Sequence, residues 1–160
     1  AMARAVRAFH GLAHALERVG QVQGVTFVND SKATNIVSAT RALESFPRDV
    51  VVILGGRHKG GRFEDLREVV RARCRAVVAI GEATPLIEAA LADVVPVQRA
   101  GSMAEAVRAG WALAPQGGTV LLAPACASFD MFRDYAARGA AFVEEVRRLS
   151  DGQSSVLAPR

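Results

Sequence analysis

Short runs of valine and isoleucine alternate along this chain with stretches of helical periodicity, and this alternation limits the fold more than any other feature. Because the runs are apolar on both faces and are separated by helices, the sequence predicts an α/β fold, a Rossmann-like three-layer sandwich around a mostly parallel sheet of about six strands. The predicted strands cover 24–29, 49–56, 75–81, 94–98 and 117–124. The predicted helices cover 36–46, 64–73, 84–92, 103–114 and 129–149.

One further strand is expected before the first of these runs. The segment "LERVGQVQG", residues 16–24, is followed at once by the strand at 24–29. A turn near Gln23 and Gly24 would fold it back as a hairpin and add one antiparallel strand to the sheet.

Composition excludes several classes of protein. The 160 residues are 51% hydrophobic and 22% charged, which is typical of one soluble domain with a real core. No apolar run approaches the roughly 20 residues of a membrane span, and no signal-peptide pattern opens the chain, so we expect a cytoplasmic protein without a membrane partner. Cys74 and Cys126 form no CxxC pair, so we expect buried free thiols and no metal site.

The net charge of +4 arises from 20 basic and 16 acidic residues. Most arginines stand beside acids in helical segments, and aromatic residues make up only 6% of the chain, so nucleic acid is not the expected partner. An anionic small molecule suits this charge equally well. We expect a monomer.

Polar residues gather after three of the predicted strands. The strand at 24–29 is followed by "DSKATN", the strand at 49–56 runs into "GGRHKGG", and the strand at 117–124 into "PACAS", with Ser128 opening the last helix. The carboxyl ends of parallel strands meet at one edge of a sheet, where helix N-termini offer free N–H groups. The basic residues and hydroxyls of these loops predict a ligand with more than one acidic group: Lys32, Arg57 and Lys59; Ser31, Thr34 and Ser128.

Each loop also has a simpler interpretation. Asp30, Ser31 or Asn35 would serve equally well as caps of the next helix. The glycines of "GGRHKGG" would permit a tight turn, and His58 alone is typical of a surface loop. The chain contains no GxxxxGK[ST], GxGxxG or GxSxG motif, and no histidine is placed by sequence to activate Cys126. Asp30 is the only acid in the three loops up to Ser128, so no paired-carboxylate site is visible there. The pattern therefore indicates a module that binds and orients a ligand.

Three motifs then carry a family resemblance. "NDSKATN", "LGGRHKGGRFEDL" and "LLAPACASFDMFRDYAARGAAF" resemble, in order and spacing, the C-terminal domain of the Mur ligase family, and within it the members that add D-glutamate. The likeness covers about residues 9–149. It divides the chain into the end of a central ATPase domain at 1–14, the amino-acid-binding domain at 15–149, and a flexible tail at 150–160.

The resemblance implies a cytoplasmic step of peptidoglycan synthesis. Such ligases use ATP and Mg²⁺ to convert the carboxylate of UDP-N-acetylmuramoyl-L-alanine to an acyl phosphate, which the amine of D-glutamate attacks. ATP and Mg²⁺ are bound mainly by the central domain, so the C-terminal domain alone is expected to be inactive.

The resemblance also implies roles for individual residues. Thr34 and Lys59 match residues that hold the α-carboxylate of D-glutamate, Ser128 and Tyr135 match those around its side-chain carboxylate, and Phe129 matches the adjacent backbone contact. Asp30 matches the group that takes the ATP ribose, and Lys32 matches the catalytic lysine near the transferred phosphate.

The sequence departs from the family at one place on the nucleotide side. Ala15 stands where the family usually has an arginine after the histidine, so either Arg18 substitutes or nucleotide affinity is weaker. The alternatives to a ligase domain are a free-standing binding module for an anionic metabolite and a docking domain for a partner protein.

Overall fold

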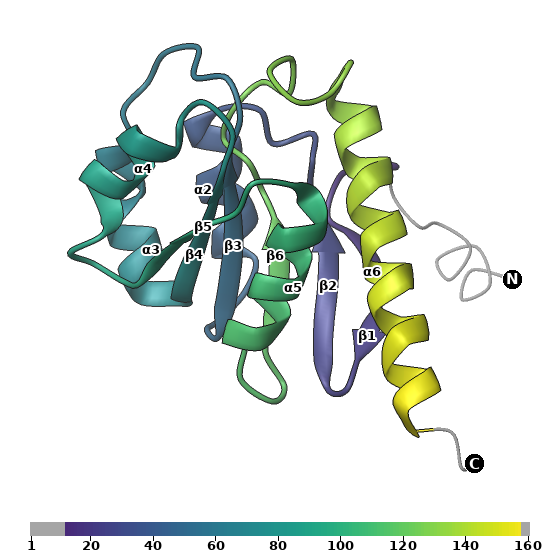
Figure 1. Ribbon diagram of the computed structural model, residues 1–160. Coiled ribbons are helices and arrows are strands. Elements are labelled where there is room, and N and C mark those ends of the chain that lie inside the picture. The colour runs from purple at the N-terminus through teal and green to yellow at the C-terminus, as the bar shows by residue number, and fades with distance from the viewer. Residues whose placement is uncertain (1–11, 158–160) are drawn as a thin grey trace, which may run out of the picture.

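The computed structural model describes residues 12–157, which form a six-stranded sheet between two layers of helices (Figure 1). All neighbouring strands are parallel except for one antiparallel pair, β1 with β2, so the predicted fold class is confirmed. The strand order is β1-β2-β6-β3-β4-β5. The strands are β1 (Glu17–Val22), β2 (Val25–Asn29), β3 (Val50–Gly55), β4 (Cys74–Ile80), β5 (Val97–Arg99) and β6 (Thr119–Leu122).

The predicted hairpin is also confirmed. Val22 pairs with Val25, and the two residues between them, Gln23 and Gly24, both have positive φ, at 45° and 81°. Two consecutive positive φ angles match the right-handed twist of a two-residue hairpin, which explains why the chain reverses at this place.

Two groups of helices cover opposite faces of the sheet. The long α6 (Tyr135–Leu157) and α5 (Met103–Leu113) lie together on one face, as Figure 1 shows, and α6 lies over β1 and β2. The other face is covered by α2 (Ile36–Glu44), the 3₁₀ turn η1 (Phe63–Leu66), α3 (Arg67–Arg73) and α4 (Thr84–Leu91).

The central strand β3 explains why the sheet needs both layers. Val50, Val52 and Leu54 point into the core beneath α2, α3 and α4, whereas Val51 and Ile53 point into the core beneath α5 and α6. All five side chains are fully buried. Burial of each side chain stabilises the fold by about 1.5–3 kcal/mol. A strand that is apolar on both faces is therefore stable only between two helical layers.

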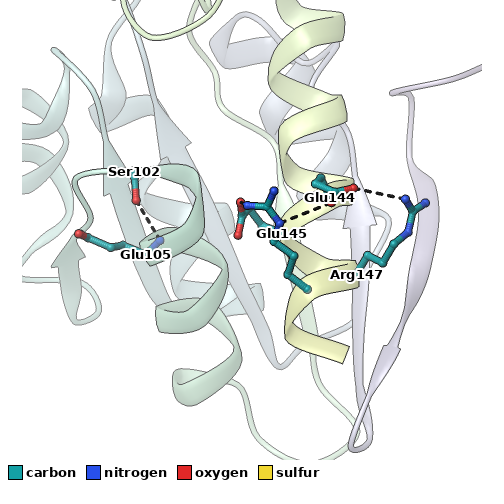
Figure 2. Close-up of polar contacts among 6 residues, drawn as sticks. Ser102, Glu105, Glu144, Glu145 and Arg147 are labelled. Carbon is teal, nitrogen blue, oxygen red and sulfur yellow. Dashed lines mark hydrogen bonds and ion pairs between the residues drawn. The ribbon is translucent and has the colours of Figure 1, made fainter. Parts of the chain in front are cut away.

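Side-chain caps fix where two of the helices begin. The Asn35 side chain accepts a hydrogen bond from the Ser38 N–H at 2.8 Å at the start of α2. Ser102 accepts from the Glu105 N–H at 3.2 Å and caps α5 in the same way (Figure 2). Such caps each stabilise a helix by about 1 kcal/mol.

The last helix differs from its predicted range. It begins at Tyr135, so the expectation that Ser128 opens it is wrong. The physical reason is the cap, because Asp134 accepts a hydrogen bond from the Ala137 N–H at 2.7 Å and starts the helix there. The helix also continues past residue 149 to Leu157, into the segment expected as a tail.

The division into domains stays a prediction. Most of the segment 1–14, expected as the end of another domain, lies outside the described residues. Between residues 12 and 157, no helix has the length and apolar character needed to cross a membrane.

Candidate functional site

The three polar loops meet at one edge of the sheet. Strands β2, β6 and β3 are neighbours and run parallel, so their carboxyl ends lie side by side. The loops that follow them are 30–35, 123–134 and 56–62, and Figure 1 shows all three at the upper edge of the sheet. The expectation that loops distant in sequence meet at one edge is therefore confirmed, with the β6 loop in the middle.

Backbone hydrogen bonds join the β6 loop to the β2 loop. The Ala125 N–H donates to the Ala33 carbonyl at 2.9 Å, and the Asp30 N–H donates to the Leu122 carbonyl at 2.8 Å. Ala125 has a positive φ of 62°, an uncommon conformation for a residue with a side chain. The residue directly before Thr34 is thus held against the loop that carries Ser128.

A second set of backbone bonds joins the β6 loop to the β3 loop. Arg57 and Ala127 pair as an isolated antiparallel bridge, and the Gly55 N–H donates to the Pro124 carbonyl at 2.9 Å. Gly56, at φ 135°, lies between these bonds, where a Cβ would be 2.3 Å from the Ala127 carbonyl oxygen. Only glycine fits this close approach without a shift of the backbone.

The predicted binding residues occupy different depths of this edge. Lys59 is exposed and borders a shallow hollow of about 340 Å³ between its loop and the start of α2, lined also by Asn35 and Gly61. Thr34, one residue before Asn35, is half-buried. Ser128 lies deepest, with 2% of its surface exposed. The structure brings the three loops together, and the roles of these side chains stay predictions.

The positive charge of the edge comes from the lysines. Within residues 12–157, neither Lys32 nor Lys59 is paired with a carboxylate, and both are exposed. Arg57, expected to add a third free charge, instead forms an ion pair with Glu82 at 3.4 Å. This pair raises the pKa of Arg57 through its hydrogen bond to Glu82. Two unpaired ammonium groups therefore remain for an anion.

Asp30 is held below the surface. Its Oδ1 accepts a hydrogen bond from the Leu16 N–H at 3.0 Å, which fixes the segment entering β1 against the β2 loop. Burial raises the pKa of Asp30, and the hydrogen bond from Leu16 opposes this rise. Of the three residues proposed as caps of α2, only Asn35 is one, because Asp30 and Ser31 bond elsewhere.

Phe129 and Tyr135 face outward at the same edge. Phe129 is 63% exposed and Tyr135 is 39% exposed, so both rings are accessible from solvent. The Tyr135 carbonyl accepts a hydrogen bond from the Ser31 hydroxyl at 2.7 Å. The Tyr135 ring packs edge-on against the His14 ring. The start of α6 is therefore attached to the β2 loop.

Arg138 is the main residue that the sequence analysis missed. Only 1% of its surface is exposed, and its guanidinium bonds to Ser31 and to Cys126. Burial lowers the pKa of Arg138 to about 10 and raises the pKa of Cys126 to about 12. At the next residue, Gly139, a Cβ would lie 2.2 Å from the His14 ring, so α6 closely approaches the segment before β1 here.

Two further side chains have buried atoms without a described partner. Asp130 accepts from the Glu82 N–H through Oδ2 at 3.0 Å, while its Oδ1 is buried and unpaired among the described residues. His58, expected at the surface, is half-buried with its ring centre 4.9 Å from that of Phe63, and its Nδ1 has no partner in the described part of the chain.

This chemistry suits binding of anions. Ammonium groups, hydroxyls and backbone N–H groups complement carboxylates or phosphates. Across residues 12–157, no group of three or more His, Cys, Asp and Glu side chains is arranged to hold a metal ion.

Residues 16–126 match the family described as Mur ligase, glutamate ligase domain. The chain is 49% identical over 148 residues to a UDP-N-acetylmuramoylalanine--D-glutamate ligase of Desulfotalea psychrophila, which covers 92% of this chain and 32% of that protein. It is 46% identical over 154 residues to the enzyme of the same name from Pseudomonas aeruginosa, covering 94% of this chain and 34% of that protein.

Solved structures share the fold. A murein peptide ligase from Psychrobacter arcticus aligns over 98% of this chain and 33% of its own, with a TM-score of 0.62 and 16% identity. A MurF ligase from Thermotoga maritima, in complex with ADP, aligns over 91% of this chain and 33% of its own, with a TM-score of 0.61 and 15% identity. The chain spans about a third of the length of the curated relatives it matches.

Proposed function

Because this chain belongs to the Mur ligase family through its glutamate ligase domain, we propose that it is the amino-acid-binding C-terminal domain of an ATP-dependent, cytoplasmic ligase. The whole enzyme would add D-glutamate to UDP-N-acetylmuramoyl-L-alanine in peptidoglycan synthesis. The observation that carries this proposal is the meeting of three loops in one cationic, hydroxyl-rich edge, since a diacid needs two separate sets of donors.

In this proposal the domain places the nucleophile. Thr34 and Lys59 hold the α-carboxylate of D-glutamate, while Ser128, Phe129 and Tyr135 surround its side-chain carboxylate. Charge-assisted hydrogen bonds of about 1.5–3 kcal/mol each suffice to bind and orient such a dianion. The two carboxylates are then fixed, and the amine between them has one direction of approach to the acyl group.

The nucleotide side involves fewer residues of this chain. ATP supplies the phosphoryl group that activates the substrate carboxylate. Lys32 would neutralise charge near the transferred phosphate, and Asp30 would accept from a ribose hydroxyl with the carboxylate oxygen that Leu16 does not occupy. Mg²⁺ would be held mainly by the central domain, because no described cluster of this chain offers it ligands.

The test joins this chain to the N-terminal and central domains of a D-glutamate-adding relative. We expect release of ADP that requires both D-glutamate and UDP-N-acetylmuramoyl-L-alanine, and little release with L-glutamate. The 160-residue chain alone should release none.

A joined enzyme that folds, binds ATP and releases no ADP with D-glutamate would contradict the proposal. Isothermal titration of the 160-residue chain with D-glutamate, L-glutamate, ATP and UDP would then show whether it is instead a stand-alone binding module.

A further inference from the structure

Among the described residues, Arg138 makes all of its side-chain hydrogen bonds to the loops of the candidate site. Its Nε donates to the Ser31 hydroxyl at 2.9 Å, its Nη2 donates to the Ser31 carbonyl at 2.8 Å, and its Nη1 donates to the Cys126 carbonyl at 2.9 Å. One planar group, projecting from the first turn of α6, therefore joins the β2 loop to the β6 loop.

These contacts lie close to the proposed ligand contacts on both loops. Ser31 stands between Asp30 and Lys32 and three positions before Thr34, and Cys126 stands two positions before Ser128. The Ser31 hydroxyl in turn donates to the Tyr135 carbonyl. A shift of the guanidinium would therefore move both sides of the site together.

The guanidinium adds a side-chain attachment to the two backbone bonds between these loops. The backbone bonds run from Asp30 to Leu122, where the loops leave the strands, and from Ala125 to Ala33. Arg138 holds the loops at two further positions, Ser31 and Cys126, and so adds to the constraint on their separation and relative orientation.

The burial of the Arg138 charge has a free-energy cost. Within residues 12–157, no carboxylate forms a hydrogen bond or an ion pair with Arg138, and burial of an unpaired cation is unfavourable. An apolar side chain of similar volume would avoid this cost, but it would remove the donor to the buried Ser31 and Cys126 carbonyls. The five donors of a guanidinium, held in a rigid fork, are what an apolar side chain lacks.

We propose that Arg138 is a positioning residue that sets the separation between the two carboxylate subsites, and thereby the chain length of the diacid that is accepted. In this inference, the identity of the diacid rests on the proposed function. The attachment of the two loops by Arg138 does not depend on the proposed function.

The first test measures amide hydrogen exchange in the 160-residue chain. Arg138→Met removes every donor, and Arg138→Lys keeps the charge but replaces the fork with one ammonium group. We expect exchange about tenfold faster or more at Ser31, Ala33 and Ala125 in Arg138→Met, a smaller effect in Arg138→Lys, and unchanged exchange in β3 and β4.

The matched control is Arg147→Met on the same helix. Arg147 is exposed and pairs with Glu144 at 3.3 Å on the surface of α6 (Figure 2). Its loss should leave the exchange of both loops unchanged. Native protection of the loops in a folded Arg138→Met, or in Arg138→Lys if the methionine variant does not fold, would overturn the proposal.

The second test uses the joined enzyme and compares D-glutamate with D-aspartate. We expect Arg138→Lys to raise the KM for D-glutamate about tenfold with a smaller change in kcat, and to reduce the preference for D-glutamate over D-aspartate. A merely structural residue would lower the activity with both acids equally, and that result would overturn the role in selectivity. If the native joined enzyme has no D-glutamate-dependent activity, the proposed function fails, and the exchange experiment still decides whether Arg138 holds the loops.

Discussion

Arg57 and Ala127 exchange both of their backbone hydrogen bonds, with N–H to carbonyl distances of 2.9 and 3.1 Å. This pair lies outside the sheet and joins the loop that carries Lys59 to the loop that carries Ser128. Lys59 and Ser128, which are proposed to hold different carboxylates of one ligand, therefore lie on loops that are joined by backbone hydrogen bonds.

A side chain at Gly56 should separate these loops. In Gly56→Ala the new Cβ would meet the Ala127 carbonyl at 2.3 Å, so overpacking of about 1–3 kcal/mol adds to the strain of a positive φ. Gly60→Ala is the control, because its φ of 110° is strained in the same way but open space surrounds it. Urea unfolding should show the larger loss of stability for Gly56→Ala, and equal losses in the two variants would contradict the close approach.

Asp30 should lower the stability of the domain at neutral pH. Burial raises the pKa of Asp30 in the folded state above its ordinary value of 3.8. This shift adds to the free energy of unfolding when the carboxyl group is protonated. The added stability is complete below the unfolded pKa and is lost as pH rises through the folded pKa. Asp30→Asn keeps an acceptor for the Leu16 N–H and cannot ionise. We expect a larger free energy of unfolding for this variant near pH 7, with the difference closing below about pH 4.

The control for this measurement is Asp151→Asn on α6, because Asp151 is exposed. Its unfolding free energy at pH 7 should lie within about 0.5 kcal/mol of that of the native chain, as is usual for a surface substitution. If Asp30→Asn were less stable than the native chain at pH 7, the Asp30 carboxylate would be stabilising and its assigned pKa direction would be wrong.

Both thiols should be unreactive in the folded chain. Burial raises the pKa of Cys74 and of Cys126 to about 12, so almost no thiolate is present at pH 8. A chromogenic disulfide reagent should label neither cysteine in buffer and both in concentrated urea. Rapid labelling of Cys126 in the native chain would mean that the β6 loop opens, contrary to the hydrogen bonds at Ala125 and Ala127.

The sequence predicted the fold and the edge of the sheet where the three polar loops meet. Runs such as 50–55, apolar on both faces, indicate a sheet covered on both sides, and polar residues after strands indicate the carboxyl edge. These features are local and periodic, so they can be recognised without knowledge of tertiary contacts.

The contacts within that edge could not be predicted in the same way. Arg138 lies in a helix rich in charged residues, and nothing local distinguishes it from exposed Arg147 and Arg148. Its burial depends on how closely α6 approaches β2, which is a tertiary property. The pairing of Arg57 with Glu82 likewise joins two loops that are 25 positions apart.

The most direct test of the shared site is the KM for D-glutamate of the joined enzyme with Thr34→Ala, Lys59→Ala or Ser128→Ala. We expect each variant to raise this KM about tenfold or more, and the effects of Thr34→Ala and Lys59→Ala, which act on one carboxylate, to be less than additive when combined. An unchanged KM in Thr34→Ala or Lys59→Ala would contradict it.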